Sequence, residues 1–308
     1  MMNSGGRFAG ADSDPPAVAH SPAGGRYERL IDYYESAGPD LEEWSPAFNM
    51  HFGFYRRGCN PFRREPMLAE MNRQVLDRLG LPRDREHLIL DLGCGVGATV
   101  RYGAVMFPLA RILGVTVVPW QVAKGNAWNV QLELYPRANL ELADYTRTGL
   151  PAACADGAVA IESACHADGP DKEPFIREAA RILRPGARLV VADGFLKADA
   201  HALDPLSRRV HEALCRSFVL PELGQIARFT DTLGRHGFHD ITVNEISWRV
   251  APSALHAPLA VLSFSLKKAL RRERLTEQSV NNLKGSLLSA ALGLNRRKVG
   301  YFLVTGRR

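Results

Sequence analysis

Strands and helices alternate between Leu88 and Phe195, and this alternation constrains the fold more than any other feature of the chain. Five short apolar runs, mostly separated by segments with helical spacing, cover residues 88–92, 111–118, 139–142, 157–163 and 187–195. The first run, L-I-L-D-L, is almost wholly apolar, as expected for a strand that is covered on both faces of a parallel sheet. The pattern predicts a doubly wound α/β sheet with right-handed crossovers.

The regions on either side of the alternation complete the organisation of the chain. Helical spacing of apolar residues predicts helices over residues 27–35, 64–79 and 225–236. Two further apolar runs predict strands over 241–248 and 299–305. The insertion before the last strand is helix-prone, and we expect it to form a lid over the carboxyl edge of the sheet. The expected segments are a disordered coil (1–25), a helical cap segment (26–84), the nucleoside-binding core (85–250), the helical insertion (251–298) and a final core strand (299–308).

The positive charge of the chain is concentrated near its C-terminus. The net charge is +6, but residues 251–308 hold eleven Lys and Arg against two Glu, so this part carries +9 and the rest −3. Such a cluster is typical of a solvated helix face, and contact with an anionic substrate or a membrane surface is the alternative. No aromatic residues or known module accompany it in the manner of a nucleic-acid-binding protein, so no nucleic-acid partner is expected.

The remaining composition points to a cytoplasmic protein. The five cysteines lack zinc-ligand or C-x-x-C spacing, which favours a reduced compartment and predicts no metal site. No apolar run approaches the ~20 residues of a transmembrane helix, and no signal-peptide core is present.

A glycine-rich turn follows the first strand directly. It reads Asp91-Leu92-Gly93-Cys94-Gly95-Val96-Gly97. Glycines at this edge of a parallel sheet allow a ligand to approach the backbone closely, and an acidic residue before the turn suits a cationic ligand. The third glycine comes one residue too early for a dinucleotide motif, and the Lys-Ser/Thr of a P-loop is missing.

D-L-G-C-G-V-G resembles motif I of the class I S-adenosylmethionine-dependent methyltransferases. The run G-V-T-V-V-P-W-Q at 114–121 is similar to the G-V-T-L-S-x-x-Q run of their sterol, tocopherol and cyclopropane-fatty-acid branch. The resemblance implies a Rossmann-like, seven-stranded α/β methyltransferase sheet with a helical cap. It also implies S-adenosylmethionine as cofactor, bound by Tyr34, Asp91, Gly93, Cys94, Gly95, Gly97, Thr116, Val117, Gln121, Asp144 and Tyr145.

Three of these cofactor residues have a structural alternative. Tyr34 is also a candidate for simple packing. Thr116 is also an ordinary β-branched strand residue. Asp144 follows the third strand, where a turn or helix-cap role is common.

The end of the fourth strand carries the candidate catalytic residues. A-I-E-S-A-C-H-A at 160–167 resembles the A-I-E-A-T-C-H-A stretch of sterol C-methyltransferases, and prenyl-diphosphate C-methyltransferases have a similar E-S pair. An anion at Glu162 would stabilise a carbocation and accept the adjacent proton. A purely structural hydrogen bond to a backbone turn is the alternative for Glu162. His166 is a candidate base for a hydroxyl group or a pocket-lining residue.

The aromatic stretch at 45–55 resembles the N-terminal segment that covers cofactor and substrate in the sterol and tocopherol enzymes. It makes His51 and Tyr55 candidate substrate-pocket residues. Packing in the hydrophobic core is the alternative role for its aromatic rings.

These features together predict methylation of a hydrophobic small molecule, with C-methylation of an alkene in a prenyl diphosphate or sterol-like isoprenoid as the first hypothesis. Mg²⁺ is expected only if the acceptor is a diphosphate. An O- or N-methyltransferase of a natural product or quinone and a non-catalytic nucleoside-binding module are the alternatives. The sequence leaves the oligomeric state open.

Overall fold

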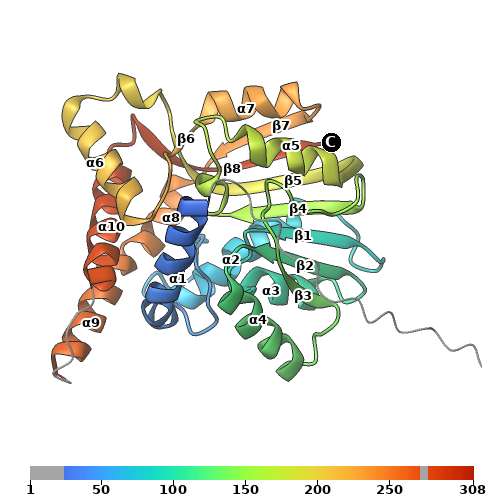
Figure 1. The fold of residues 1–308 in the computed structure, drawn as a ribbon, viewed down its shortest axis with the longest axis horizontal. Coiled ribbons are helices and arrows are strands. Elements are labelled where there is room, and N and C mark those ends of the chain that lie inside the picture. Colours follow the sequence, from blue (N-terminus) through green and yellow to red (C-terminus); the bar gives the residue numbers. More distant parts are fainter. Residues whose placement is uncertain (1–23, 271–276) are drawn as a thin grey trace, which may run out of the picture.

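A computed structural model describes residues 24–270 and 277–308. Over these residues a central sheet has the strand order β3-β2-β1-β4-β5-β8-β7, and a two-residue strand β6 pairs with β5. The expected Rossmann-like fold is confirmed (Figure 1). The strands are β1 (Leu88–Leu92), β2 (Arg111–Thr116), β3 (Ala138–Leu142), β4 (Ala155–Ile161), β5 (Leu183–Leu196), β6 (Gly224–Gln225), β7 (His239–Glu245) and β8 (Val299–Arg307).

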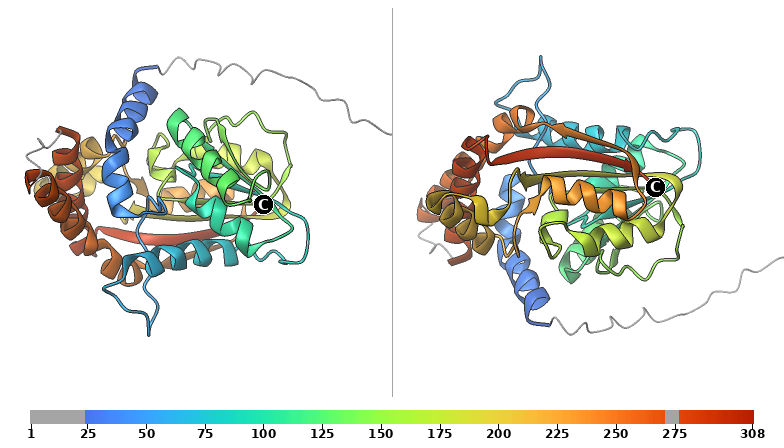
Figure 2. Two further views of the ribbon diagram at one scale, coloured as in Figure 1. Left: turned by 90° about the horizontal axis from the view of Figure 1, so that it is seen from below. Right: turned by 90° about the horizontal axis from the view of Figure 1, so that it is seen from above.

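Helices cover both faces of the sheet (Figure 2). One apolar cluster joins the sheet to α2 (Arg64–Asp77), α3 (Ala98–Met106) and α8 (Ser247–Ala254). A second cluster on the opposite face joins it to α5 (Glu173–Ile182) and α7 (Ile226–Arg235). The buried strands therefore contact apolar side chains on both sides, which explains their near-continuous apolar runs. The helix α4 (Pro119–Gln131) connects β2 to β3.

The remaining helices form a cap at the carboxyl ends of the strands. They are α1 (Gly24–Trp44), α6 (Pro205–Ser217), α9 (His256–Leu270) and α10 (Glu277–Leu294). A small third cluster of apolar residues holds α6 and α10 against the ends of β5 and β8. Among the described residues, no helix is both long and apolar enough to cross a membrane.

Three elements differ from the sequence-based expectation. The first helix extends to Trp44 rather than Glu35, and α6 was not expected. The strand expected over 241–248 ends at Glu245, because residues from Ser247 onward form α8, whose Val250 packs beneath the sheet. Packing against the sheet thus outweighs the strand preference of Trp248.

Candidate active site

An open cavity with about 980 Å³ of empty volume lies at the carboxyl ends of β1, β2 and β4, beneath α1. Its described lining comprises Tyr27, Leu30, Tyr34, Phe48, Met50, His51, Asp91, Gly93, Cys94, Gly95, Ala98, Thr99, Thr116, Val117, Val118, Gln121, Asp144, Tyr145, Thr146, Ile161, Glu162, Ser163, His166, Ala167, Asp168 and Pro174.

The glycine-rich turn forms one wall of this cavity. Gly93 has a φ of +88°, and a Cβ there would lie 2.4 Å from the Cβ of Ser163. Gly95 has a φ of +53°, and its Cβ would meet the Met50 sulfur at 2.8 Å. Both positions therefore require glycine for backbone conformation and for space. Gly97 does not line the cavity; it is the residue before α3, with a φ of +81° that again favours glycine.

The carboxyl group of Asp91 lies inside the protein, and one of its oxygens, Oδ2, has no hydrogen-bond partner. Burial raises the pKa of Asp91 to about 7. A buried carboxylate without a partner costs free energy that a cationic ligand would recover. The ammonium group of the methionine part of S-adenosylmethionine is such a ligand.

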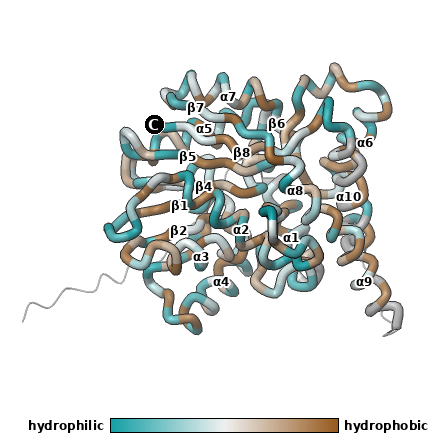
Figure 3. Tube along the Cα trace, turned by 180° about the vertical axis from the view of Figure 1, so that it is seen from behind, coloured by the Kyte–Doolittle hydropathy of each residue, from teal (hydrophilic) through white to brown (hydrophobic). Residues whose placement is uncertain are grey.

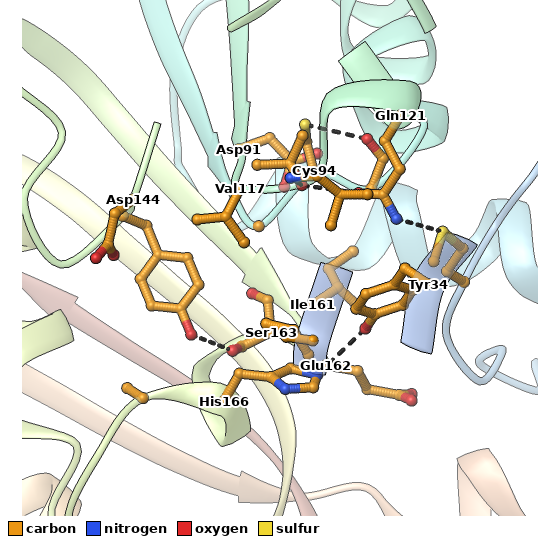
Figure 4. Close-up of a pocket in the computed structure, with 18 of the residues that line it drawn as sticks. Tyr34, Asp91, Cys94, Val117, Gln121, Asp144, Ile161, Glu162, Ser163 and His166 are labelled. Atoms are coloured by element: carbon orange, nitrogen blue, oxygen red, sulfur yellow. Dashed lines mark hydrogen bonds between the residues drawn. The ribbon is translucent and has the colours of Figure 1, made fainter. Parts of the chain in front are cut away.

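The residues after β2 form the adjoining wall. Thr116 Oγ1 donates to Gln121 Oε1 over 2.7 Å, and both side chains are buried. This bond fixes the start of α4 against the end of β2 and leaves the side chain of Val117 facing the cavity (Figure 4). An apolar residue there suits the flat face of an adenine ring.

Asp144 and Tyr145 follow β3 and reach the same cavity. Asp144 Oδ1 accepts from the backbone N–H and the hydroxyl of Thr146, and Oδ2 accepts from the Tyr27 hydroxyl over 2.6 Å. Asp144 therefore has the turn role that the sequence left open, and it also ties α1 to the site. Tyr145 donates to the Ser163 carbonyl over 2.7 Å, which links β3 to the tip of β4.

Glu162 occupies the tip of β4 with a φ of +49°, a conformation in which a non-glycine residue is uncommon. Its Oε1 accepts from the Phe52 backbone N–H over 2.7 Å and from the Tyr301 hydroxyl over 2.8 Å. Burial, with a smaller contribution from the nearby carboxyl of Asp193, raises the pKa of Glu162 to about 8. The carboxyl thus holds the aromatic segment in place and lines the cavity (Figure 4).

His166 lies one turn beyond Glu162, in the short 3₁₀ helix η1 (Ala164–His166). Its Nε2 is 3.2 Å from the hydroxyl oxygen of Tyr34 on α1, and the two side chains point toward one another (Figure 4). Burial raises the pKa of the Tyr34 hydroxyl well above its ordinary value, so this group stays protonated. The pair brings α1 and the tip of β4 together across the cavity.

His51 and Tyr55 separate in the structure. His51 lines the cavity, and its two ring nitrogens contact the Phe52 carbonyl and Asn72 Oδ1. Burial lowers the pKa of His51, which favours the neutral ring. Tyr55 does not line the cavity; its backbone N–H donates to the Arg249 carbonyl, which directs this residue toward α8.

The sequence reasoning missed several residues of the site. Ser163, whose hydroxyl donates to the Leu92 carbonyl over 2.5 Å, lies beside Glu162 in the quoted E-S pair and could have been found there. Met50 lies within the aromatic stretch. No sequence pattern indicated that Tyr301 belongs to the site, because only the register of β8 against β5 brings it to Glu162.

The described lining is acidic. It contains Asp91, Asp144, Glu162 and Asp168 and no Lys or Arg. Among the described residues no group of three or more His, Cys, Asp or Glu is arranged to hold a metal ion. The arrangement therefore suits a positively charged ligand beside an apolar one.

The comparisons with known proteins agree with this geometry. A sequence model of the methyltransferase domain matches residues 90–191. The methyltransferase GfsG of Streptomyces halstedii is 30% identical over 231 residues, which cover 72% of this chain and 77% of that protein. A chloroplastic tocopherol O-methyltransferase of Arabidopsis thaliana is 27% identical over 231 residues, which cover 71% of this chain but only 65% of that protein. The match thus spans less than two thirds of the plant protein's length.

Solved structures share the fold at low sequence identity. The cyclopropane synthase MmaA2 of Mycobacterium tuberculosis superposes with a TM-score of 0.76 at 18% identity, covering 92% of this chain and 98% of that one. A geranyl diphosphate C-methyltransferase of Streptomyces coelicolor A3(2), solved with Mg²⁺, geranyl diphosphate and S-adenosyl-L-homocysteine, gives 0.67 at 15% identity, with 94% and 100% covered. With the fold, the glycine turn and the 30%-identical relative in agreement, the chain belongs to the class I S-adenosylmethionine-dependent methyltransferases.

Proposed function

We propose that the protein methylates a carbon atom of an uncharged, apolar acceptor with an electron-rich double bond, of the sterol-like isoprenoid class. One observation carries the proposal. The carboxyl of Glu162 lies in the cavity wall, is desolvated, and has two neutral hydrogen-bond donors but no cationic side chain as partner among the described residues. Such a group is costly unless a positive charge arises beside it.

The residues present fit the cofactor. Asp91 would hold its ammonium group, the backbone at Gly93 and Gly95 would accommodate its methionine part, and Val117 would contact the adenine. When bound, S-adenosylmethionine supplies an electrophilic methyl group on a positively charged sulfur. These roles of the four residues in cofactor binding are part of the proposal.

Glu162 has a defined part in this chemistry. Addition of a methyl group to an alkene carbon leaves a positive charge on the neighbouring carbon of the acceptor. An ionised Glu162 would stabilise that charge and accept the adjacent proton, which restores a double bond. With a pKa of about 8 this carboxyl is mostly protonated at pH 7, whereas a nearby cation favours the ionised form.

The charge of the lining supports an uncharged acceptor over a prenyl diphosphate. A diphosphate needs cationic or metal partners, and the described lining offers carboxylates instead. Among the basic residues of the insertion that were candidates for this role, those at positions 267, 268, 271, 272 and 274 lie outside the described side chains. The side chains of Lys284, Arg296, Arg297 and Lys298 are described and do not line the cavity. Mg²⁺ belongs to the proposal only if the acceptor is a diphosphate.

A second candidate function is O-methylation of a hydroxyl or phenol. The pair of His166 and Tyr34 supports it, because an imidazole, a common general base in enzymes, lies at the cavity. The plant relative is a tocopherol O-methyltransferase, which also favours this function.

Reciprocal variants separate the two functions. Purified protein is incubated with methyl-labelled cofactor and a panel of sterols, prenyl diphosphates, quinones and phenols, and the products are identified by mass spectrometry. For C-methylation, Glu162→Gln should lower kcat about 1000-fold, within the range for a general base, while His166→Gln has a much smaller effect. The opposite ranking would establish O-methylation, and calorimetric binding of the cofactor without turnover of any acceptor by the wild type would establish a binding module.

A further inference from the structure

An exposed apolar stripe runs along α9. Leu255, directly before the helix, and Leu259, Leu262 and Leu266 within it are 68%, 63%, 64% and 59% exposed. Their spacing of four, three and four residues places them on one helical face. Figure 3 shows hydrophobic stretches on α9 at the outer edge of the molecule. Single exposed leucines are ordinary, but an aligned set marks an interaction surface.

The loop at 56–63 continues this stripe. Phe62, near the end of this loop, is 86% exposed. The ring of His256, at the start of α9, hydrogen-bonds to the carbonyl of Pro61 over 2.8 Å, so the loop and the stripe lie side by side. The combined surface, which we call the α9 face, comprises Phe62, Leu255, Leu259, Leu262 and Leu266.

Basic side chains border the α9 face. Arg56, Arg57, Arg63 and Arg249 are all exposed. None of these four forms an ion pair with a described Asp or Glu. The segments 55–64 and 246–270, which supply the whole surface, contain no acidic residue. These two segments therefore combine apolar and positively charged groups without a carboxylate of their own. Outside them, Glu70 on α2 has its pKa lowered in part by Arg56.

We propose that the α9 face docks on an anionic phospholipid surface. Apolar side chains insert at the boundary of headgroups and acyl chains, while arginines attract the lipid phosphates. Charge favours this occupant over a second copy of the chain, because an interface between two copies would bring the unpaired arginines of both near each other. The helix α9 also packs against α1, which lines the cavity through Leu30 and Tyr34. A docked protein would thus hold its cavity close to a lipid phase.

Vesicle sedimentation tests the proposal without any measurement of activity. The wild type should sediment with vesicles of equal parts phosphatidylcholine and phosphatidylglycerol, and much less with phosphatidylcholine alone. The triple variant Leu259→Ser, Leu262→Ser and Leu266→Ser should lose at least about tenfold in partitioning, which corresponds to about 1.4 kcal/mol. A matched control replaces three exposed apolar residues elsewhere, Val105, Leu109 and Leu132 (72%, 51% and 58% exposed), by Ser and should sediment like the wild type.

A charge variant and an oligomer measurement complete the experiment. Arg56→Gln, Arg57→Gln and Arg63→Gln together should weaken partitioning by about fivefold per arginine, from about 1 kcal/mol each, and salt should reproduce this loss. Cofactor binding and circular dichroism establish that each variant is folded. Unchanged sedimentation of the leucine variant would overturn the proposal. So would a dimer of the wild type in light scattering that the leucine variant dissociates, which would make the α9 face an interface between copies.

Discussion

The two walls of the cavity are built in different ways. The nucleoside wall consists of residues between Asp91 and Gly95 and between Thr116 and Gln121. They follow two adjacent parallel strands, so residues close in the sequence lie together. On the acceptor wall, hydrogen bonds join residues 110, 132 and 139 positions apart, as in Phe52–Glu162, Tyr34–His166 and Glu162–Tyr301. The first wall depends on local backbone geometry and the second on tertiary packing, so changes in the two should have separable effects.

The largest effect on the nucleoside wall is expected from Gly93→Ala. The new Cβ would lie 2.4 Å from the Ser163 Cβ at a φ of +88°, so the turn must move. Cofactor affinity measured by calorimetry should fall at least about 100-fold, since left-handed strain alone costs about 1–2 kcal/mol and the contact adds to it. Gly186→Ala is the control, because Gly186 has a φ of +85° but no atom within 4 Å. Equal losses of affinity in both variants would show that backbone strain, and not the contact with Ser163, decides the effect.

A smaller effect on cofactor affinity is expected when the charge of Asp91 is changed by pH or removed by mutation. A carboxyl with a pKa of about 7 must ionise before it pairs with a cation, so cofactor affinity should rise with pH and level off above about 7. Below the pKa the slope approaches a tenfold change per pH unit. Asp91→Asn should remove the slope and lower affinity about tenfold at pH 8. A persistent slope in this variant would assign the titration to another group.

The smallest effect is expected on the acceptor wall, from Tyr301→Phe. The Tyr301 hydroxyl donates to Glu162, and this bond favours the ionised carboxyl. Its loss should raise the pKa of Glu162 and move the rising limb of the pH profile of kcat to higher pH, with kcat near pH 7 lowered about fivefold for one lost hydrogen bond. Cofactor affinity should stay unchanged. A loss of affinity instead would mean that the two walls are coupled.

The same difference explains what the sequence could predict. Asp91, Gly93, Thr116 and Gln121 were found because their spacing is local and the chemistry of the turn is specific. Glu162 and His166 were predicted as site residues from the short motif at 160–167, and both line the cavity.

Tyr301 and Tyr27 could not be predicted, since nothing local to either residue states which strand or helix it will face. Tyr55 was expected in the pocket from the aromatic stretch, but that stretch turns at Gly53, whose added Cβ would lie 2.5 Å from the Met67 backbone, and carries Tyr55 to α8. Where each residue of an irregular segment lies in the fold depends on such packing contacts, which the sequence pattern does not reveal.

The place of β8 in the sheet has a consequence for how the protein is made. Within the described chain, β7 is attached to the sheet only through β8, and β8 is synthesised after all the other described strands. Until residues 299–307 emerge, β5 presents an open edge that can pair with other chains, and Glu162 lacks one of its two donors. The nucleoside wall can therefore form before β8 is synthesised, whereas the acceptor wall is completed only after β8 has joined the sheet.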